Sequence, residues 1–315
     1  MSKAAIVGAG LIGRAWAISF ARAGFDVALF DQDGTAADRA LGFIDSVLDD
    51  LHANDLLNGN APDAVRKRIT PITSLKTALD GTVHVQENAP EQLDIKKALY
   101  AELDSLASPG TVLSSSTSAL LPSHIFKGLK GARRCLVVHP INPPYLVPAV
   151  EVVPSPWTEA AVMDRTAKLM RDIGQAPIVM KREIDGFVMN RMQGALLEEA
   201  FRMVADGYAS VEDIDIGLRE GLALRWSFMG PFETIDLNAP GGVGDYIRRY
   251  QQIYERLFPS MQRRVDWAGE VLETVEGDRR ARLPEKELVE RSRWRDRRLM
   301  ALIAHKKSAA KKIGS

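Results

Sequence analysis

The first half of the chain alternates between short apolar runs and longer stretches with apolar residues at helical spacing. The runs Ala4 to Val7 and Val27 to Phe30 contain no polar position, as expected of strands that are covered on both faces. Similar runs predict further strands at Ile69 to Ile72, Thr82 to Gln86, Thr111 to Ser115, Arg134 to Val138, Val150 to Val153 and Pro177 to Met180. Strands that alternate with helices predict an α/β fold with a doubly wound sheet.

The hydrophobic pattern of the remaining chain is helical throughout. Phe187 to Ala205 is apolar-rich at helical spacing, Ser210 to Asp213 has the composition of a capping box, and no later run resembles a strand. We therefore expect an N-terminal domain over residues 1–184 and an all-helical C-terminal domain over residues 185–315. The lysine-rich end that begins at His305 is expected to fray.

A glycine-rich turn follows the first strand. Gly8, Gly10 and Gly13 have G-x-G-x-x-G spacing, and a helix is expected to begin at Leu11 and Ile12. Glycine at these places permits a tight turn, lets the backbone approach a pyrophosphate and lets the helix pack closely on the strand. The N–H groups of the first helical turn favour phosphate. The N-terminal domain is therefore expected to be a Rossmann-type, dinucleotide-binding domain.

The second strand ends in Asp31, 18 residues after Gly13. An acidic residue at this place hydrogen-bonds the adenosine ribose of NAD, whereas NADP needs a nearby arginine for its 2′-phosphate. The segment Asp31-Gln32-Asp33 contains no basic residue. NAD is therefore the predicted cofactor.

Composition and charge exclude several classes of protein. The chain has 315 residues, of which 46% are hydrophobic, and its 41 Lys and Arg balance its 41 Asp and Glu, so nothing indicates nucleic acid or an anionic membrane as a partner. Cys135 is interpreted as a core residue rather than a nucleophile. No apolar run reaches membrane-spanning length, and a first strand at Lys3 leaves no room for a signal peptide. A cytoplasmic protein without a metal site is expected.

Polar residues lie where three of the predicted strands end. They are the serine-rich segment Ser114 to Ser118, His139 on a proline-rich loop, and Glu151. Histidine suits proton removal from an alcohol as hydride leaves for a nicotinamide, and a carboxylate on its other ring nitrogen would fix the tautomer. Taken singly, a histidine such as His139 is more often structural than catalytic, and Glu151 could simply be a solvated acid. Together the three features are the parts of a dehydrogenase site.

Several segments together resemble the L-3-hydroxyacyl-CoA dehydrogenase superfamily over nearly the whole chain. They are Val-Gly-Ala-Gly-Leu-Ile-Gly (7–13), Ser-Ser-Ser-Thr-Ser (114–118), His-Pro-Ile-Asn-Pro-Pro (139–144), Val-Glu-Val-Val (150–153) and Gly-Phe-Val-Met-Asn-Arg (186–191). Within the superfamily the chain is more similar to the L-gulonate 3-dehydrogenase and lambda-crystallin branch, through residues 86–91, 139–145 and 221–233.

The resemblance implies a set of site residues. It assigns His139 and Glu151 as the catalytic pair, Ser118 and Asn190 as contacts to the substrate oxygen, and Glu91, Lys96 and Asn142 as contacts to the nicotinamide half of NAD or neighbours of it. One departure is Ser116, where the family has Asn. Both side chains are small hydrogen-bonding groups, so only the detail of that loop is affected.

A second departure concerns the substrate. Acyl-CoA enzymes of the superfamily bind CoA through a serine and a lysine, and the matching residues here are Val47 and Asn54. Four nearby aspartates would repel CoA phosphates; they are Asp45, Asp49, Asp50 and Asp55. A small free L-3-hydroxy acid is therefore the preferred substrate. The alternatives are a 3-hydroxyacyl-CoA or carnitine-like substrate and, from another class, a non-catalytic NAD-binding crystallin-like protein.

Two expectations concern the helical domain. The apolar residues of Phe187 to Ala205 exceed what one thin helical layer would bury, and the resemblance implies dimers through this domain, so a homodimer is expected. Arg225 lies in the apolar segment 222–228 and is a candidate to bind the carboxylate of a free acid. An ion pair between domains or subunits is the equally weighted alternative for Arg225.

Overall fold

The chain divides into two compact units in a computed structural model that describes residues 2–314. Unit 1 comprises Met1–Asn190 and Asp296–His305, and unit 2 comprises Arg191–Arg295 and Lys306–Ser315. No helix within residues 2–314 is long and apolar enough to cross a membrane.

Unit 1 is built on one eight-stranded sheet with the order β3-β2-β1-β4-β5-β6-β7-β8. The strands are β1 (Lys3–Val7), β2 (Asp26–Phe30), β3 (Ile69–Ile72), β4 (Thr82–Glu87), β5 (Val112–Ser115), β6 (Cys135–Pro140), β7 (Ala149–Pro154) and β8 (Ala176–Val179). Every predicted strand is present, and the doubly wound α/β sheet is confirmed. The bounds differ from the predicted ones by a residue or two at the ends.

The last two strands of the sheet, β7 and β8, run opposite to the other six. β7 pairs antiparallel with β6, whereas all other neighbouring strands are parallel. The physical reason is the connection: residues 141–148 contain no helix, and a parallel return needs a crossover of about a dozen residues or more. The start of β7, and not its end, therefore lies beside the end of β6, and Glu151 reaches the edge of the sheet that carries His139.

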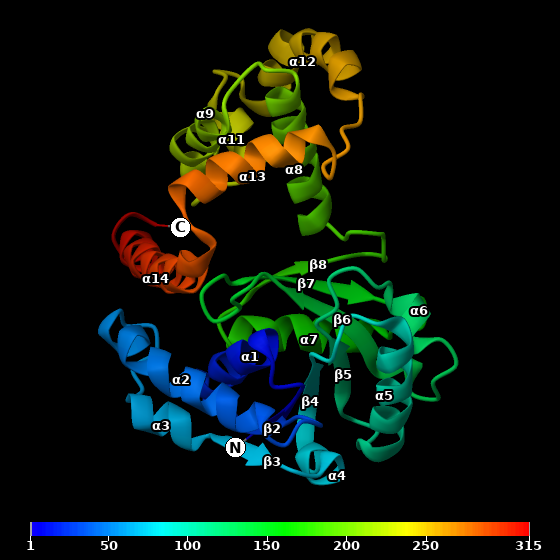
Figure 1. The fold of residues 1–315 in the computed structure, drawn as a ribbon. Helices are drawn as coiled ribbons and strands as arrows, with labels where there is room; N and C mark the ends of the chain where they lie inside the picture. The colour runs from blue at the N-terminus through cyan, green and yellow to red at the C-terminus, as the bar shows by residue number, and fades with distance from the viewer. Residues whose placement is uncertain (1, 315) are drawn as a thin grey trace. The chain divides into compact units, whose positions relative to one another are not determined.

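The side chains of the sheet alternate between two cores. Ala4 and Ile6 of β1 belong to one core, and Ala5 and Val7 belong to the other. One face is covered by α1 (Leu11–Arg22), α2 (Ala36–Ala53), α3 (Pro62–Lys67) and α7 (Ala160–Asp172), and the other by α4 (Leu75–Leu79), α5 (Leu93–Leu106) and α6 (Pro122–Phe126), with the short η1 (Ala132–Arg134) before β6 (Figure 1). Helices on both faces explain why the strands lack polar alternation.

Unit 2 contains helices and no strand within the described residues. Its elements are most of α8 (Met189–Ala205), then α9 (Val211–Ile216), η2 (Gly217–Leu222), α10 (Ala223–Trp226), α11 (Pro231–Leu237), α12 (Gly242–Met261), α13 (Glu270–Arg282) and η3 (Glu285–Glu287). The predicted capping residue is confirmed, because the Ser210 hydroxyl accepts a hydrogen bond from the N–H of Asp213. The helical character of this part of the chain is confirmed with it.

The C-terminal segment is a helix, so the expectation of a frayed tail from His305 is wrong. α14 runs from Leu288 to Ile313. Residues 296–305 of α14 belong to unit 1, where Met300 is buried in the core beneath α1 and α2. Arg297 forms an ion pair of 2.9 Å with Asp50 on α2. Alanine and lysine are good helix formers, which lets the helix continue past its packed part.

Candidate active site

His139 and Glu151 face each other across the antiparallel pair β6 and β7. The two residues are register partners, and His139 Nδ1 lies 2.7 Å from Glu151 Oε2. Both lie inside strands, so the prediction of His139 on a loop is wrong: β6 extends to Pro140, beyond the apolar run that predicted it. Both side chains are buried, and the Phe187 ring packs against the imidazole with 5.7 Å between centroids.

The second oxygen of Glu151 holds the start of α8. Oε1 accepts hydrogen bonds from the backbone N–H groups of Val188, at 2.6 Å, and Met189, at 2.9 Å. These donors belong to the first turn of a helix, where N–H groups lack helical partners and favour a negative charge. Three nitrogen atoms therefore fix the carboxylate in place. The Nε2 atom of His139 makes no hydrogen bond within residues 2–314 and is available to a substrate oxygen.

Asn190 and Ser118 are brought together by the same helix start. The side-chain N–H of Asn190 donates to the backbone oxygen of Ser118 at 2.8 Å. Ser118 itself is exposed and lies just beyond β5. A chain of contacts therefore links the four residues: His139 to Glu151, Glu151 to the first turn of α8, and α8 through Asn190 to Ser118.

The loop that carries Ser118 is held by Glu91. Glu91 Oε1 accepts hydrogen bonds from the Thr117 hydroxyl and from the backbone N–H groups of Ser118, at 2.9 Å, and Ala119, at 3.0 Å. Burial raises the pKa of the Glu91 carboxyl, but the Thr117 hydroxyl, the charge of Lys96 and the backbone donors together bring it below its usual value. The carboxylate is thus kept charged where it orders the loop.

Lys96 is buried behind this loop. Its Nζ atom lies 2.8 Å from Glu87 Oε1, 3.1 Å from the Ala89 oxygen and 3.6 Å from Glu91 Oε2. A buried ammonium needs such partners because an unpaired charge is strongly disfavoured away from water. Lys96 thus joins the end of β4 to Glu91, and its predicted contact with the nicotinamide half stays a prediction.

Of the three glycines in the turn after β1, only Gly10 has open space beside it. A Cβ on Gly8, whose φ is +94°, would come within 2.8 Å of the Asn88 backbone, and one on Gly13 within 1.8 Å of the Gly8 oxygen. A Cβ on Gly10 would meet nothing within 4 Å. Gly8 and Gly13 therefore need to be glycine for the fold, whereas the opening at Gly10 is free for a phosphate group. Leu11 and Ile12 begin α1 as predicted.

A cleft of about 600 Å³ extends from this turn along the ends of β1, β2 and β4. Gly8, Gly10 and Asp31 line it. Asp31 Oδ2 accepts the N–H of Ala9 at 2.7 Å, so the carboxylate is fixed at the rim. Asn142, beyond β6, has a buried side-chain oxygen with no partner among the described residues. An open glycine, a fixed carboxylate and an unpaired acceptor fit an adenine dinucleotide.

A basic residue from outside the segment 31–33 lies near the end of β2. No base lies in Asp31-Gln32-Asp33, but Arg39, on the first turns of α2, reaches the strand end. Its guanidinium is 2.7 Å from Asp33 Oδ2, and it also bonds Thr35. A helical residue eight positions after Asp31 could not be recognised as a neighbour from the segment alone. Because Asp33 already occupies this arginine, the preference for NAD is retained.

Comparison with known proteins identifies the family. Residues 3–184 match the 3-hydroxyacyl-CoA dehydrogenase NAD binding domain, and residues 186–278 match the 3-hydroxyacyl-CoA dehydrogenase C-terminal domain. The chain belongs to this dehydrogenase family. Its N-terminal unit is an NAD-binding domain, and the chain is an NAD-dependent dehydrogenase that acts on a CH–OH group.

Relatives in the dehydrogenase family include crystallins and enzymes. The chain is 41% identical to lambda-crystallin of Oryctolagus cuniculus over 305 residues, covering 96% of this chain and 95% of that one. It is 40% identical to L-carnitine dehydrogenase of Streptomyces griseus over 242 residues, covering 77% and 70%. The structure of an NAD+-dependent dismutase, 5-formyl-3-hydroxy-2-methylpyridine 4-carboxylic acid 5-dehydrogenase, superposes with a TM-score of 0.82 at 26% identity, covering 97% and 99%.

A buried polar network, which was not predicted from the sequence, lies along β4 and β5. His84 Nε2 lies 2.9 Å from the Ser114 hydroxyl and 3.1 Å from Gln86 Oε1, and Gln86 donates to the Ser116 hydroxyl at 2.7 Å. Ser116 also accepts from the Trp16 indole N–H at 3.1 Å. The signal available in the sequence was the pair of polar residues, His84 and Gln86, within a strand of the sheet.

Arg225 lies in unit 2, on α10. It is half-buried, and no carboxylate within residues 2–314 lies within 4.0 Å of its guanidinium. The structure therefore shows no ion-pair partner for it in the described part of this chain.

Proposed function

We propose that this protein oxidises the 3-hydroxyl of a small free L-3-hydroxy acid, in the manner of an L-gulonate 3-dehydrogenase. The observation that supports this chemistry is the 2.7 Å contact between His139 Nδ1 and Glu151, which leaves Nε2 for the substrate. The two substrate-oxygen contacts carried over from the family, Ser118 and Asn190, belong to the same connected set.

Proton removal falls to His139 in this proposal. Nε2 accepts the hydroxyl proton, and the charge that forms on the ring is stabilised by Glu151 at Nδ1. Bound NAD supplies the hydride acceptor. Ser118 and Asn190 orient the hydroxyl so that its oxygen faces the imidazole. Phe187 packs on the ring and keeps water from that side.

The preference for a free acid rests on α2. Val47 is partly buried against the core, and the Asn54 side chain donates to the Asp50 oxygen at 2.8 Å, so neither side chain presents a cation to CoA. Two of the four aspartates have arginine partners, Asp45 with Arg66 and Asp50 with Arg297. The repulsion argument is thereby weakened, but the lack of a phosphate-binding group in this stretch still disfavours CoA.

A carnitine-type substrate is the second candidate. It is favoured by the 40% identity to a protein named L-carnitine dehydrogenase. Carnitine is itself a free 3-hydroxy acid, so both candidates need the same carboxylate and hydroxyl recognition.

The deciding experiment is a screen for NADH formation. The purified protein is given NAD with L-gulonate, L-3-hydroxybutyrate, its CoA thioester or L-carnitine. Turnover of a free acid at higher kcat/KM than the thioester supports the proposal. Preference for the thioester would overturn it, and NADH binding without any turnover would favour a crystallin-like role.

A further inference from the structure

We propose that a basic cavity in unit 1, at the edge of the sheet opposite the cofactor cleft, binds an organic polyphosphate such as a nucleoside triphosphate. The cavity has a volume of about 910 Å³ and is lined by the end of α5, the loop 128–131, the η1 turn and the first half of α7. It lies where β5 and β6 begin, whereas the glycine turn and Asp31 lie where β1 and β2 end. The inference does not depend on the proposed function.

A buried ion pair in the wall of the cavity fixes the loop 128–131. The guanidinium of Arg134 lies 2.8 Å from Asp104 Oδ1 and donates to the backbone oxygen of Asp104 at 2.9 Å. Asp104 Oδ2 accepts the N–H of Gly131 at 2.9 Å, and a Cβ on Gly131 would overlap Asp104 Oδ1. The loop can lie this close only because residue 131 is glycine. Arg134 and Asp104 balance each other's charge and hold the backbone of their neighbours in place.

Three further basic side chains line the cavity with too little negative charge beside them. Lys130 and Arg165 form no ion pair within residues 2–314. Arg133 has only Glu159, at 3.7 Å, and an ion pair between two exposed side chains contributes little. Burial is the main cause of the low pKa of His84, and the charge of Arg165 lowers this pKa further, as expected of a cation that no acid neutralises. The cavity thus has an excess of two positive charges.

The two arginines reach the cavity from elements that are fixed to each other. Glu159, Val162 and Arg165 follow one another at intervals of three residues, which places them on one face of α7. The start of α7 is tied to η1, because the N–H of Glu159 donates to the backbone oxygen of Arg133 at 3.0 Å. Little rearrangement is therefore needed to bring both guanidinium groups to one ligand.

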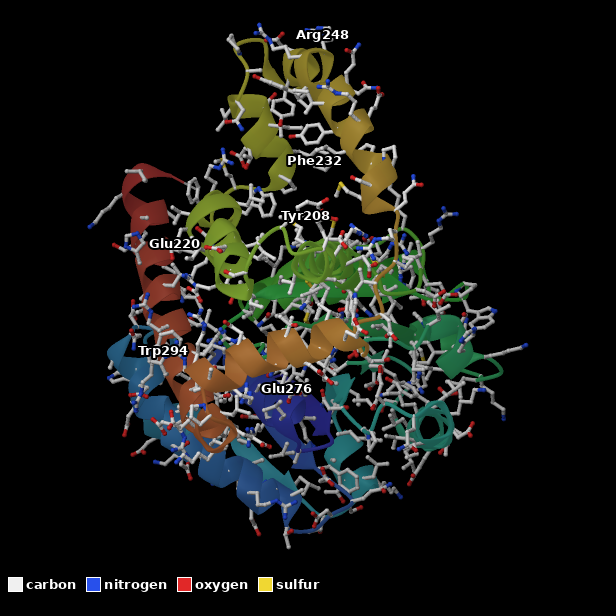
Figure 2. The ribbon with its side chains drawn as sticks, turned by 45° about the horizontal axis from the view of Figure 1, so that its top comes forward. Tyr208, Glu220, Phe232, Arg248, Glu276 and Trp294 are labelled. Atoms are coloured by element: carbon white, nitrogen blue, oxygen red, sulfur yellow. The ribbon has the colours of Figure 1, made fainter. Side chains whose placement is uncertain are left out.

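A cavity of similar size in unit 2 has balanced charges instead. Its volume is about 750 Å³, and Trp294, labelled in Figure 2, is one of its lining residues. Its four basic side chains are matched by four acidic ones. Arg282 lies 3.0 Å from Glu212, and Arg279 lies 3.7 Å from Asp215. That cavity needs no anion from outside the chain, whereas the basic cavity of unit 1 does.

The lining of the basic cavity favours an organic polyphosphate over a bare phosphate ion. Clustered arginine and lysine side chains bind phosphate oxygens through charge-assisted hydrogen bonds. The lining also includes Ala101, Leu129 and Val162, against which an uncharged part of a ligand can pack. The volume lies within the range of small-molecule sites, roughly 300–1,000 Å³. A nucleoside triphosphate combines several negative charges with such an uncharged part.

The test measures the binding of ATP and of inorganic tripolyphosphate by calorimetry, without added magnesium, to the protein saturated with NADH. Saturation with NADH keeps both anions out of the cofactor cleft. The unmodified protein is compared with the double variant Arg133→Gln/Arg165→Gln. The control is Lys127→Gln/Arg171→Gln, which removes the same charge from exposed residues outside the cavity.

We expect ATP to bind the unmodified protein more tightly than tripolyphosphate does. The Kd for ATP should rise roughly tenfold or more in Arg133→Gln/Arg165→Gln and stay within about threefold in the control. A melting curve shows whether each variant folds. Lys130→Gln changes only an exposed loop residue and gives a second measurement, with a rise in Kd of roughly threefold or more.

Four results would contradict the basic cavity as a nucleotide site. Absence of binding at millimolar ATP would overturn it, and so would an equal loss of affinity in the control variant, which would indicate general attraction to positive charge. Release of NADH by ATP would place the nucleotide in the cofactor cleft. Tripolyphosphate that binds as tightly as ATP would rule out a contact with the uncharged part. The screen for NADH formation tests the proposed function separately, so either can fail alone.

Discussion

At the scale of single residues, the pair of His139 and Glu151 carries the clearest expectation. His139→Ala should reduce turnover by roughly 10²- to 10⁴-fold, the usual contribution of a positioned acid–base group, with NADH binding nearly intact. Glu151→Gln should reduce turnover less, because Glu151 orients the ring and does not itself transfer the proton. Steady-state kinetics and NADH titration measure both effects. Near-normal turnover in His139→Ala would mean that another base acts.

Cofactor choice depends on Asp31. We expect the unmodified protein to prefer NAD over NADP by at least about tenfold, or about 1.4 kcal/mol, and Asp31→Ala to lose that preference. Adding Asp33→Ala should shift the preference further toward NADP, because it releases Arg39 from its 2.7 Å ion pair. The ratio of kcat/KM for the two cofactors reports each step. Equal use of both by the unmodified protein would contradict the assignment.

His84 gives the folded state a defined pH dependence. Burial lowers the pKa of His84 from 6.5 to about 4, although its hydrogen bond to Gln86 acts in the opposite direction. The unfolded chain therefore binds a proton between these pH values that the folded chain does not. The contribution of neutral His84 to the free energy of unfolding is complete above pH 6.5 and is lost as the pH falls through about 4. The free energy of unfolding thereby decreases by about 3 kcal/mol. Urea unfolding at several pH values should show a smaller decline in His84→Asn than in the unmodified protein.

At the scale of elements, the spacing of apolar residues predicted the positions of strands and helices. It could not predict features that depend on contacts between segments far apart in the sequence. The strands were recognisable because each is a short apolar run. The direction of β7 was not, because it follows from a connection too short for a crossover. The end of α14 from His305 was expected to fray, because its lysine-rich sequence has no clear apolar periodicity, but it continues the helix as far as Ile313. The pairing of His139 with Glu151 was expected from their types, but their strand register comes only from the antiparallel pair.

The packed part of α14 should contribute measurably to stability. Met300 is 1% exposed, and Leu302, two residues later, is 45% exposed. Met300→Ala should lower the free energy of unfolding by roughly 2–5 kcal/mol because it leaves a cavity in the core. Leu302→Ala on the same helix should change it little. Thermal and urea unfolding of the two variants make the comparison, and equal effects would show that this segment does not pack as described.

At the scale of the whole molecule, unit 2 leaves large apolar side chains exposed. Phe228, Phe232 and Leu237 are 71%, 80% and 70% exposed. Apolar surface of this extent usually marks an interface, so we expect a homodimer through unit 2, as the family resemblance also implies. Light scattering at micromolar concentration should give twice the 34.7 kDa chain mass. Phe232→Asp should shift the equilibrium toward monomer, whereas a monomer mass for the unmodified protein would count against the dimer.

Glu151 divides one negative charge between the imidazole and the opening turn of α8. Without the N–H donors of Val188 and Met189, the carboxylate charge would act more strongly on His139. The charged imidazolium would then be stabilised more. Thermodynamic linkage makes the effect reciprocal: a protonated His139 draws on the carboxylate and loosens its hold on Val188 and Met189. Glu151 therefore couples the backbone that leads into α8 to the proton-transfer step.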